Sequence, residues 1–259
     1  MEITSNASLE RDGAVVHFEV HGEDTASVPL LLTHGFGSSA AMWDSNVDAL
    51  AVDRQIITWD VRGHGRTVTA PDPQRYTHGA CVEDMAAILD ACSIPCAAVG
   101  GLSLGGYLSL RFHLMRKERV AALLLCDCGP GYRDSEGRDR WNEFAESSAA
   151  ALERNGALSL PTSAEARLGA GDPAALALAA RGILMQHDAS VIDSLASIDV
   201  PTLVLVGELD TAFRKAADYM AERIPGAELS VIPGAGHAAN MDDPDAFAAS
   251  VRTFLASAV

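Results

Sequence analysis

The segment Gly101-Leu102-Ser103-Leu104-Gly105 has the spacing Gly-x-Ser-x-Gly and joins an apolar run to a helical pattern over residues 104–115. In a strand–turn–helix this spacing is typical of a nucleophile elbow, a tight turn that holds a serine hydroxyl clear of the end of a sheet. The turn requires small residues two positions before and after the serine, and both positions are glycine. The sequence therefore predicts that Ser103 is a nucleophile at the amino end of a helix.

Strand-like and helix-like patterns alternate on both sides of this turn. Residues 14–21 alternate in polarity and predict an early antiparallel strand. Continuous apolar runs, typical of strands buried on both faces, cover residues 29–33, 55–59, 97–100, 120–126, 200–206 and 228–232. Helical patterns follow at residues 77–92, 104–115, 213–224 and 243–255. This alternation predicts an α/β fold with a mostly parallel sheet and helices on both faces.

The alternation breaks in the middle of the chain, where residues 130–197 contain no strand-like run. Large apolar residues recur there at helical spacing from Trp141 through Phe144, and Thr162-x-x-Glu165 is a capping-box pattern. Asp172-Pro173 is typical of a further helix start. We expect residues 130–197 to form a helical cap. The core domain is then made of residues 1–129 and 198–259.

A serine hydroxyl becomes a strong nucleophile only when a histidine, oriented by a carboxylate, accepts its proton. His237 lies in a glycine-rich loop after the last strand-like run, and Asp210 closely follows the run before it. Loops beyond the carboxyl ends of parallel strands meet at one edge of a sheet. The order Ser, Asp, His is also that of nucleophile-elbow enzymes. We predict a catalytic triad of Ser103, Asp210 and His237. Asp127 and Glu208, which also follow strand-like runs, are alternative acids.

Two backbone N–H groups are expected to form an oxyanion hole, which binds the negative charge that develops on the carbonyl oxygen. One belongs to Leu104, directly after the nucleophile, and the other to Phe36 in the turn His34-Gly35-Phe36-Gly37. The side chains of Phe36 and Leu104 are also expected to contact the substrate. Trp141 and Met185, in the cap, are candidates for the cap interior and for the wall of the substrate pocket.

These motifs together resemble the α/β-hydrolase family in its compact, capped form. Four motifs follow the order of the family over nearly the whole chain: His34-Gly35-Phe36-Gly37, Asp60-Val61-Arg62-Gly63-His64-Gly65, Gly101-Leu102-Ser103-Leu104-Gly105 and Gly236-His237. The resemblance implies an eight-stranded, mostly parallel sheet with a helical cap, and the same triad and oxyanion-hole residues. It also implies that His34, Arg62 and His64 belong to the scaffold. Dehalogenases and epoxide hydrolases of the family would carry Asp at position 103, so those activities are disfavoured.

The site and the resemblance indicate a serine hydrolase that cleaves small carboxylic esters through an acyl-enzyme. No metal and no organic cofactor is expected. An enol-lactonase, a carbon–carbon bond hydrolase and a perhydrolase are alternatives, because the same fold hosts all of these reactions. A non-catalytic ligand receptor is the least favoured alternative, because every part of the site is present.

The charge of the chain limits the partners that it is expected to bind. The 259 residues include 35 Asp and Glu against 19 Lys and Arg, a formal net charge of -16. Such a charge repels nucleic acid and anionic membrane surfaces, so a small ester or lactone is the expected partner. The five cysteines do not suggest a disulfide framework, and no run reaches the roughly 18 apolar residues of a membrane span. We therefore expect a cytoplasmic location. The sequence does not specify the oligomeric state.

Overall fold

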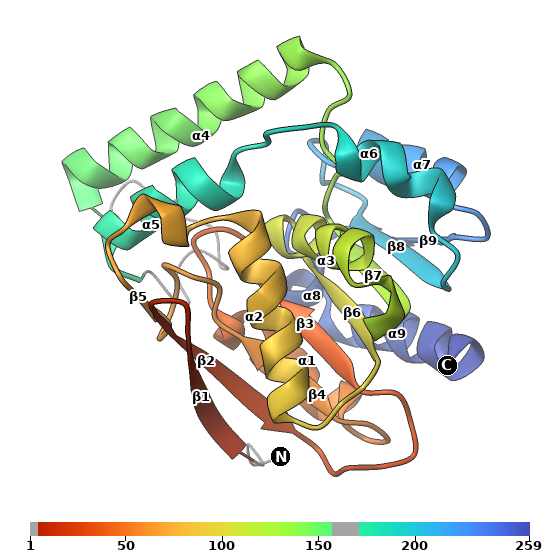
Figure 1. The fold of residues 1–259 in the computed structure, drawn as a ribbon. Coiled ribbons are helices and arrows are strands. Elements are labelled where there is room, and N and C mark those ends of the chain that lie inside the picture. Colours follow the sequence, from red (N-terminus) through yellow and green to blue (C-terminus); the bar gives the residue numbers. More distant parts are fainter. Residues whose placement is uncertain (1–4, 157–170) are drawn as a thin grey trace.

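The computed structural model describes residues 5–156 and 171–259, and one twisted sheet lies at its centre (Figure 1). Its strands are β1 (Ser5–Arg11), β2 (Ala14–His21), β3 (Leu30–Thr33), β4 (Ile56–Trp59), β5 (Val68–Thr69), β6 (Ala97–Leu102), β7 (Val120–Cys126), β8 (Thr202–Gly207) and β9 (Glu228–Ile232). The order in the sheet is β1-β2-β4-β3-β6-β7-β8-β9, with β5 paired to β2. Along this order, every neighbouring pair of strands from β4 to β9 is parallel. Among the described strands, the antiparallel pairs are those that involve β2. The mostly parallel α/β sheet that the sequence predicted is confirmed.

Two strands lie outside the sequence prediction. β1 is a polar edge strand whose residues are exposed or half-buried, so it carries no continuous apolar run. Its only local signal is the Asp12-Gly13 turn that joins it to β2, in which both residues have positive φ. Such Asp-Gly pairs are typical of two-residue hairpin turns. β5 has only two residues and pairs with the start of β2.

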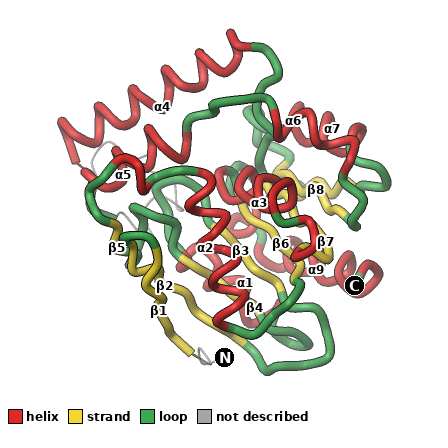
Figure 2. The backbone as a smooth tube through the Cα atoms, in the orientation of Figure 1, coloured by secondary structure: helices red, strands yellow, loops and turns green. Residues whose placement is uncertain are grey.

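Helices cover both faces of the sheet, as Figures 1 and 2 show. The core helices with sequence-predicted positions are α2 (His78–Ala91), α3 (Leu104–Met115), α7 (Arg214–Arg223) and α9 (Pro244–Ala258). The short helices α1 (Asp44–Leu50) and α8 (Ala239–Asp242) were not predicted. Alternate residues of β3 enter different cores: Leu31 belongs to the apolar cluster that contains residues of α2, α3 and α7, whereas Leu30 and Leu32 belong to the cluster that contains residues of α1 and α9. The side-chain period of two in a strand thus builds two separate apolar layers.

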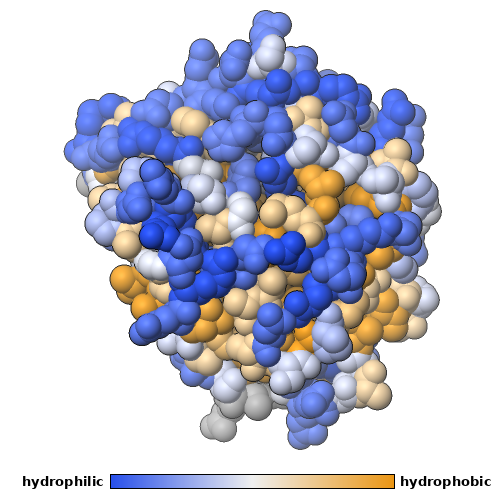
Figure 3. Space-filling model, viewed as in Figure 1, coloured by the Kyte–Doolittle hydropathy of each residue, from blue (hydrophilic) through white to orange (hydrophobic). Residues whose placement is uncertain are grey.

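The described chain between β7 and β8 consists of helices joined by irregular segments and contains no strand. It contains α4 (Ser135–Asn155), α5 (Pro173–Ala179), the π-helical turn η6 (Ala180–Leu184), α6 (Ser190–Ser194) and η7 (Leu195–Ser197). α4 lies across one end of the molecule next to α5 (Figure 1), and its outer surface is hydrophilic (Figure 3). The capping box expected at Thr162 and Glu165 lies outside the described residues. The cap boundaries at 130 and 197 stay a prediction.

Side chains on the inner face of α4 form a small apolar cluster with α5, called here the α4–α5 core. Ala149 and Leu152 pack there against Leu176 and Ala177 of α5. Phe144, which the helical spacing placed with the apolar residues, is instead 55% exposed, and its ring contacts Trp141. The stripe that faces inward follows Ala145 and Ala149, so Phe144 lies at its edge. None of the described helices is both long and apolar enough to cross a membrane.

Candidate active site

Ser103 occupies the turn between the last residue of β6 and the first residue of α3, with φ 55° and ψ -114°. A positive φ is strained for a residue with a side chain and is held only by its surroundings. The N–H of Ser103 donates to the carbonyl oxygen of Cys126 at 2.9 Å, and its carbonyl oxygen accepts from the N–H of Tyr107 at 3.2 Å. The strained turn is thus tied to β7 and to α3, at the positive end of the helix dipole.

The two glycines of the elbow allow the turn to lie against the end of β3. A Cβ atom on Gly101 would lie 2.4 Å from the carbonyl oxygen of Thr33, and one on Gly105 would lie 2.0 Å from the same atom. Both distances are far below van der Waals contact, and the obstacle is backbone that cannot rotate away. The requirement for small residues that the motif implied is therefore a direct packing requirement at both positions.

His237 and Asp210 meet at the carboxyl edge of the sheet. Nδ1 of His237 donates to Oδ2 of Asp210 at 2.8 Å. The other carboxylate oxygen accepts from the main-chain N–H groups of Ala212 and Phe213, each at 3.1 Å. Burial raises the pKa of Asp210, but the hydrogen bonds and the adjacent His237 outweigh it, so the pKa lies below its usual value. Asp210 is therefore an ionised carboxylate that orients the imidazole ring.

The two alternative acids have other partners. Oδ1 of Asp127 accepts from the N–H of Gly207 at 2.7 Å, and burial raises the pKa of Asp127 to about 7. Oε2 of Glu208, which is exposed, accepts from the N–H of Gly234 at 2.9 Å. The structure thus places Asp210 against the histidine ring, and places Asp127 and Glu208 against main-chain groups.

A cavity of about 110 Å³ adjoins the elbow. It is lined by Ser103, Leu104, Tyr107, Gly129, Pro130, Gly131, Tyr132, Trp141, Leu184, Gln186, Ala212, Phe213 and Ala216. Two sequence-predicted substrate contacts, Leu104 and Trp141, are in this wall. The other two, Phe36 and Met185, are not among the described residues that line it. The ring of Phe36 lies edge-on to His64 at 5.3 Å between centroids and packs against the α4–α5 core.

Phe213 connects the histidine to the cavity. Its ring stacks on the ring of His237, with 5.1 Å between centroids and 22° between planes, and it also lines the cavity beside Ser103. Sequence reasoning assigned Phe213 only to a helix. A signal was present, because Phe213 follows Asp210 by three residues and so shares its loop. Tyr107, one helical turn after Ser103, was likewise within reach of the elbow pattern.

The remaining motif residues make buried contacts within the scaffold. Arg62 is fully buried and donates to Asp84 through Nε at 2.6 Å and Nη2 at 2.8 Å. Nε2 of His34 accepts from the N–H of Val61 at 3.0 Å. Burial lowers the pKa of His64 to about 3, so this ring is neutral. The described residues hold no group of three or more His, Cys, Asp or Glu arranged for a metal ion.

The parallel sheet, the strained serine at its edge and the inserted helices define a hydrolase fold, and comparisons with known proteins agree. Residues 30–250 match the Alpha/beta hydrolase family, and the chain belongs to that family. It is 27% identical to 3-oxoadipate enol-lactonase 1 of Acinetobacter baylyi over 277 aligned positions, which cover 99% of this chain and 98% of the relative.

Two solved structures extend this similarity to three dimensions. A thermophilic esterase from Thermogutta terrifontis has a TM-score of 0.82 and 26% identity, over 98% of this chain and 99% of that chain. A hydrolase from Pseudomonas aeruginosa has a TM-score of 0.78 and 27% identity, over 97% of this chain and 98% of that chain. The fold and the relatives thus support hydrolase activity for this chain.

Proposed function

We propose that this protein is a serine esterase that hydrolyses small, neutral carboxylic esters through an acyl-enzyme. The observation that carries the proposal is a chain of neighbouring side chains that runs from Ser103 to Asp210. Ser103 lines the cavity beside Phe213, the ring of Phe213 stacks on His237, and His237 donates to Asp210. These contacts support a proposed nucleophile, a proposed base and a small cavity for the substrate at one sheet edge.

The proposed reaction begins when Oγ of Ser103 attacks the ester carbonyl carbon and its proton passes to Nε2 of His237. Asp210 holds Nδ1–H, so Nε2 is the nitrogen left to accept the proton, and the carboxylate stabilises the resulting imidazolium. The N–H groups of Phe36 and Leu104 bind the oxyanion. When the carbon–oxygen bond breaks, His237 returns the proton to the leaving alcohol. Water then repeats the sequence on the acyl-enzyme, which releases the acid and regenerates the serine.

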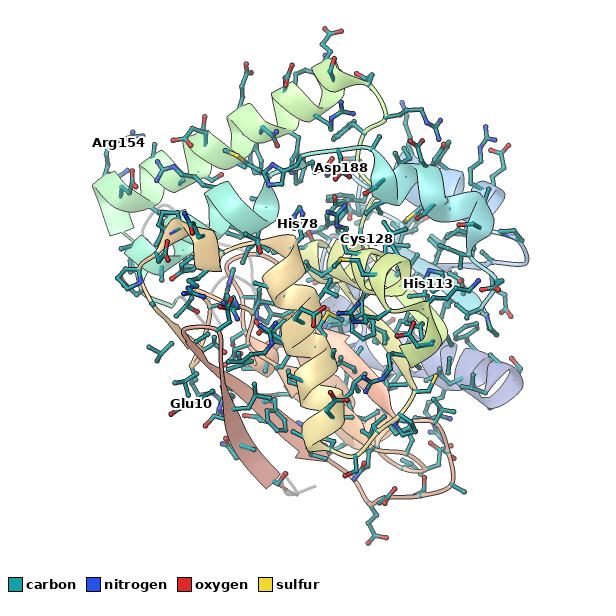
Figure 4. The ribbon with its side chains drawn as sticks, viewed as in Figure 1. Glu10, His78, His113, Cys128, Arg154 and Asp188 are labelled. Carbon is teal, nitrogen blue, oxygen red and sulfur yellow. The ribbon has the colours of Figure 1, made fainter. Side chains whose placement is uncertain are left out.

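The cavity supports a small substrate without charge. For scale, an apolar protein cavity of about 150 Å³ holds one benzene molecule, so ≈ 110 Å³ suits a short acyl or alkoxy group. No Lys or Arg is among the described residues that line it. Three arginines that could otherwise bind a substrate carboxylate are each paired with an acidic side chain: Arg62 with Asp84, Arg111 with Asp188 and Arg133 with Asp193. Figure 4 shows Asp188 at the α6 end of the cap segment.

A small lactone is the second candidate substrate. Its ring opening uses the same attack and the same proton transfers. The relative from Acinetobacter baylyi, which matches this chain over 98% of the relative's length, is named as an enol-lactonase. Carbon–carbon bond hydrolysis and peracid formation are further alternatives on the same fold. In each case we propose that residues 130–197 act as the cap over the site. The charge of the chain also favours an enzyme that binds neither nucleic acid nor an anionic membrane surface, and we propose a cytoplasmic location.

An organophosphonate serine probe provides a direct test. We expect the wild-type protein to acquire one covalent adduct, because the activated Oγ of Ser103 displaces the leaving group from phosphorus. Peptide mass spectrometry should place the adduct on Ser103, and Ser103→Ala should acquire none. Chelators should not change the labelling. An adduct on another residue, or no adduct on a folded protein, would contradict the proposal.

The size of the cavity predicts a preference for short acyl chains. In a series of acetyl, butyryl, octanoyl and palmitoyl esters of one alcohol, kcat/KM should be highest for acetyl or butyryl. Beyond the length that the cavity holds, a misplaced methylene costs roughly tenfold or more. A maximum at palmitoyl would indicate a long open groove in place of the small cavity. A carboxylated lactone that is turned over faster than every neutral ester would contradict the neutral-substrate proposal.

A further inference from the structure

The cavity wall contributed by the cap contains one side-chain amide, that of Gln186, which is only 8% exposed. Its Oε1 accepts from the main-chain N–H of Tyr132 at 3.2 Å. A main-chain N–H requires an acceptor, so this bond fixes which end of the amide faces Tyr132. The NH2 group is the other end. It donates to no group in the part of the chain that the structure describes.

The backbone of Gln186 is held rigidly. Its N–H donates to Oδ1 of Asn142 at 2.8 Å, and Nδ2 of Asn142 donates back to its carbonyl oxygen at 2.9 Å. This reciprocal pair ties the residue to α4. The π-helical turn η6 ends at Leu184, two residues earlier, and such turns often occur at functional sites. The amide is therefore presented to the cavity in one fixed orientation, as a recognition group requires.

The surroundings of this amide are mostly apolar. Pro130, Trp141, Leu184, Phe213 and Ala216 share the cavity wall. An amide donor that lines a cavity with such apolar groups gains a hydrogen bond when a bound molecule supplies an acceptor, and that molecule loses affinity when it displaces water without supplying one. Ser103 is committed to the reacting carbonyl in the proposed reaction, and the wall also holds the hydroxyl groups of Tyr107 and Tyr132. A substrate that fits must therefore satisfy a second polar group as well as the nucleophile.

We propose that the Gln186 amide is a specificity-determining hydrogen-bond donor that recognises a second acceptor oxygen on the substrate, beyond the scissile carbonyl. The inference rests on the proposed esterase function and deepens it. The favoured substrates are small neutral esters that carry a keto, ether or hydroxyl oxygen within reach of the cap. Simple alkyl esters of the same size bind in the same cavity but leave the amide unpaired.

The test uses matched esters in which an ether oxygen replaces one methylene. Phenyl methoxyacetate is compared with phenyl butyrate, and 2-methoxyethyl butyrate with butyl butyrate, so that acyl and alcohol sides are both covered. The ether oxygen also changes intrinsic reactivity. For each pair we therefore take the ratio of kcat/KM for the ether ester to kcat/KM for its alkyl partner. The informative quantity is the change in this ratio between wild type and variant. Gln186→Met should lower this ratio for at least one pair by roughly threefold to tenfold, the range for one neutral hydrogen bond.

Three further variants separate recognition from structural support. Gln186→Glu, assayed above pH 8, keeps an acceptor for the Tyr132 N–H but lacks the NH2 donor, so it should lower the same ratio. Leu184→Met changes the apolar wall and should leave the ratio unchanged. Tyr107→Phe removes the other buried hydroxyl of the wall, whose pKa burial raises to about 12, and should also leave the ratio unchanged. An unchanged ratio in both Gln186 variants, or a loss in Tyr107→Phe in their place, would overturn the proposal.

A binding measurement keeps this inference distinct from the proposed function. Calorimetry on Ser103→Ala measures binding of the intact esters without turnover, and the ether ester of one pair should bind more tightly than its alkyl partner. The double variant Ser103→Ala, Gln186→Met should lose that difference. If wild type hydrolyses none of the esters, the proposed function fails while this comparison still decides the role of Gln186. Equal binding of both members of each pair would refute the role of Gln186 alone.

Discussion

Ser103→Ala is expected to lower kcat for a short-acyl ester by on the order of 10⁴ to 10⁶, to the level that substrate binding and the oxyanion hole support by themselves. The reason is that no other hydroxyl lies on the elbow, so the acyl-enzyme cannot form. KM should change little, because the hydroxyl is not needed to hold the substrate. Steady-state kinetics with phenyl acetate or phenyl butyrate measure both quantities.

The matched control is Ser109→Ala, two helical turns away in α3. Its hydroxyl donates to the carbonyl oxygen of Gly105 at 2.8 Å, so the control also removes a buried serine hydroxyl from the same helix. We expect it to keep activity within about tenfold of wild type, because the bond that it loses contributes only about 1 kcal/mol. Thermal unfolding should show both variants folded. If Ser103→Ala keeps more than about a tenth of wild-type activity, the assigned nucleophile is wrong.

The elbow and the sheet were predictable because their signals are local. Gly101 and Gly105 are each required by one carbonyl oxygen of Thr33, so the packing constraint appears directly as a sequence pattern. Buried parallel strands appear as continuous apolar runs, and β7 and β9 have the predicted bounds. The meeting of Asp210 and His237 followed from topology, because both residues lie in loops at the carboxyl edge of the sheet.

The wall of the cavity was predictable only in part, because it depends on how the helices between β7 and β8 are rotated against the helices that cover the sheet. Trp141 faces the cavity, whereas Phe144, three residues later, is exposed. Met185 was expected in the wall and its neighbour Gln186 lies there, directly after a π-helical turn that changes the helical register. No sequence pattern indicated that turn. Phe36 was also expected to contact the substrate, but its ring packs against the α4–α5 core.

Asp210→Asn is expected to lower kcat by on the order of 10³ to 10⁴ with the fold retained. The amide can donate to Nδ1 of His237, which favours the tautomer that places the proton on Nε2, where the serine proton must arrive. The amide also has no charge to stabilise the imidazolium. Its oxygen can still accept from the N–H groups of Ala212 and Phe213, so the loop should remain in place. The value of kcat and the rate of organophosphonate labelling should fall together, because both depend on activation of Ser103.

Asp127→Asn is the matched comparison, and it should lower kcat by less than about tenfold. Asp127 is more buried than Asp210, and its Oδ1 bond to the N–H of Gly207 is one that an Asn oxygen also accepts. Because burial raises the pKa of Asp127 to about 7, its carboxyl is partly protonated at neutral pH, and a neutral amide resembles that form. If Asp127→Asn were the more damaging of the two substitutions, the orienting acid would be Asp127. The opposite ranking, measured at equal folded fraction, assigns that role to Asp210, because only the loss at Asp210 removes a carboxylate bonded to His237.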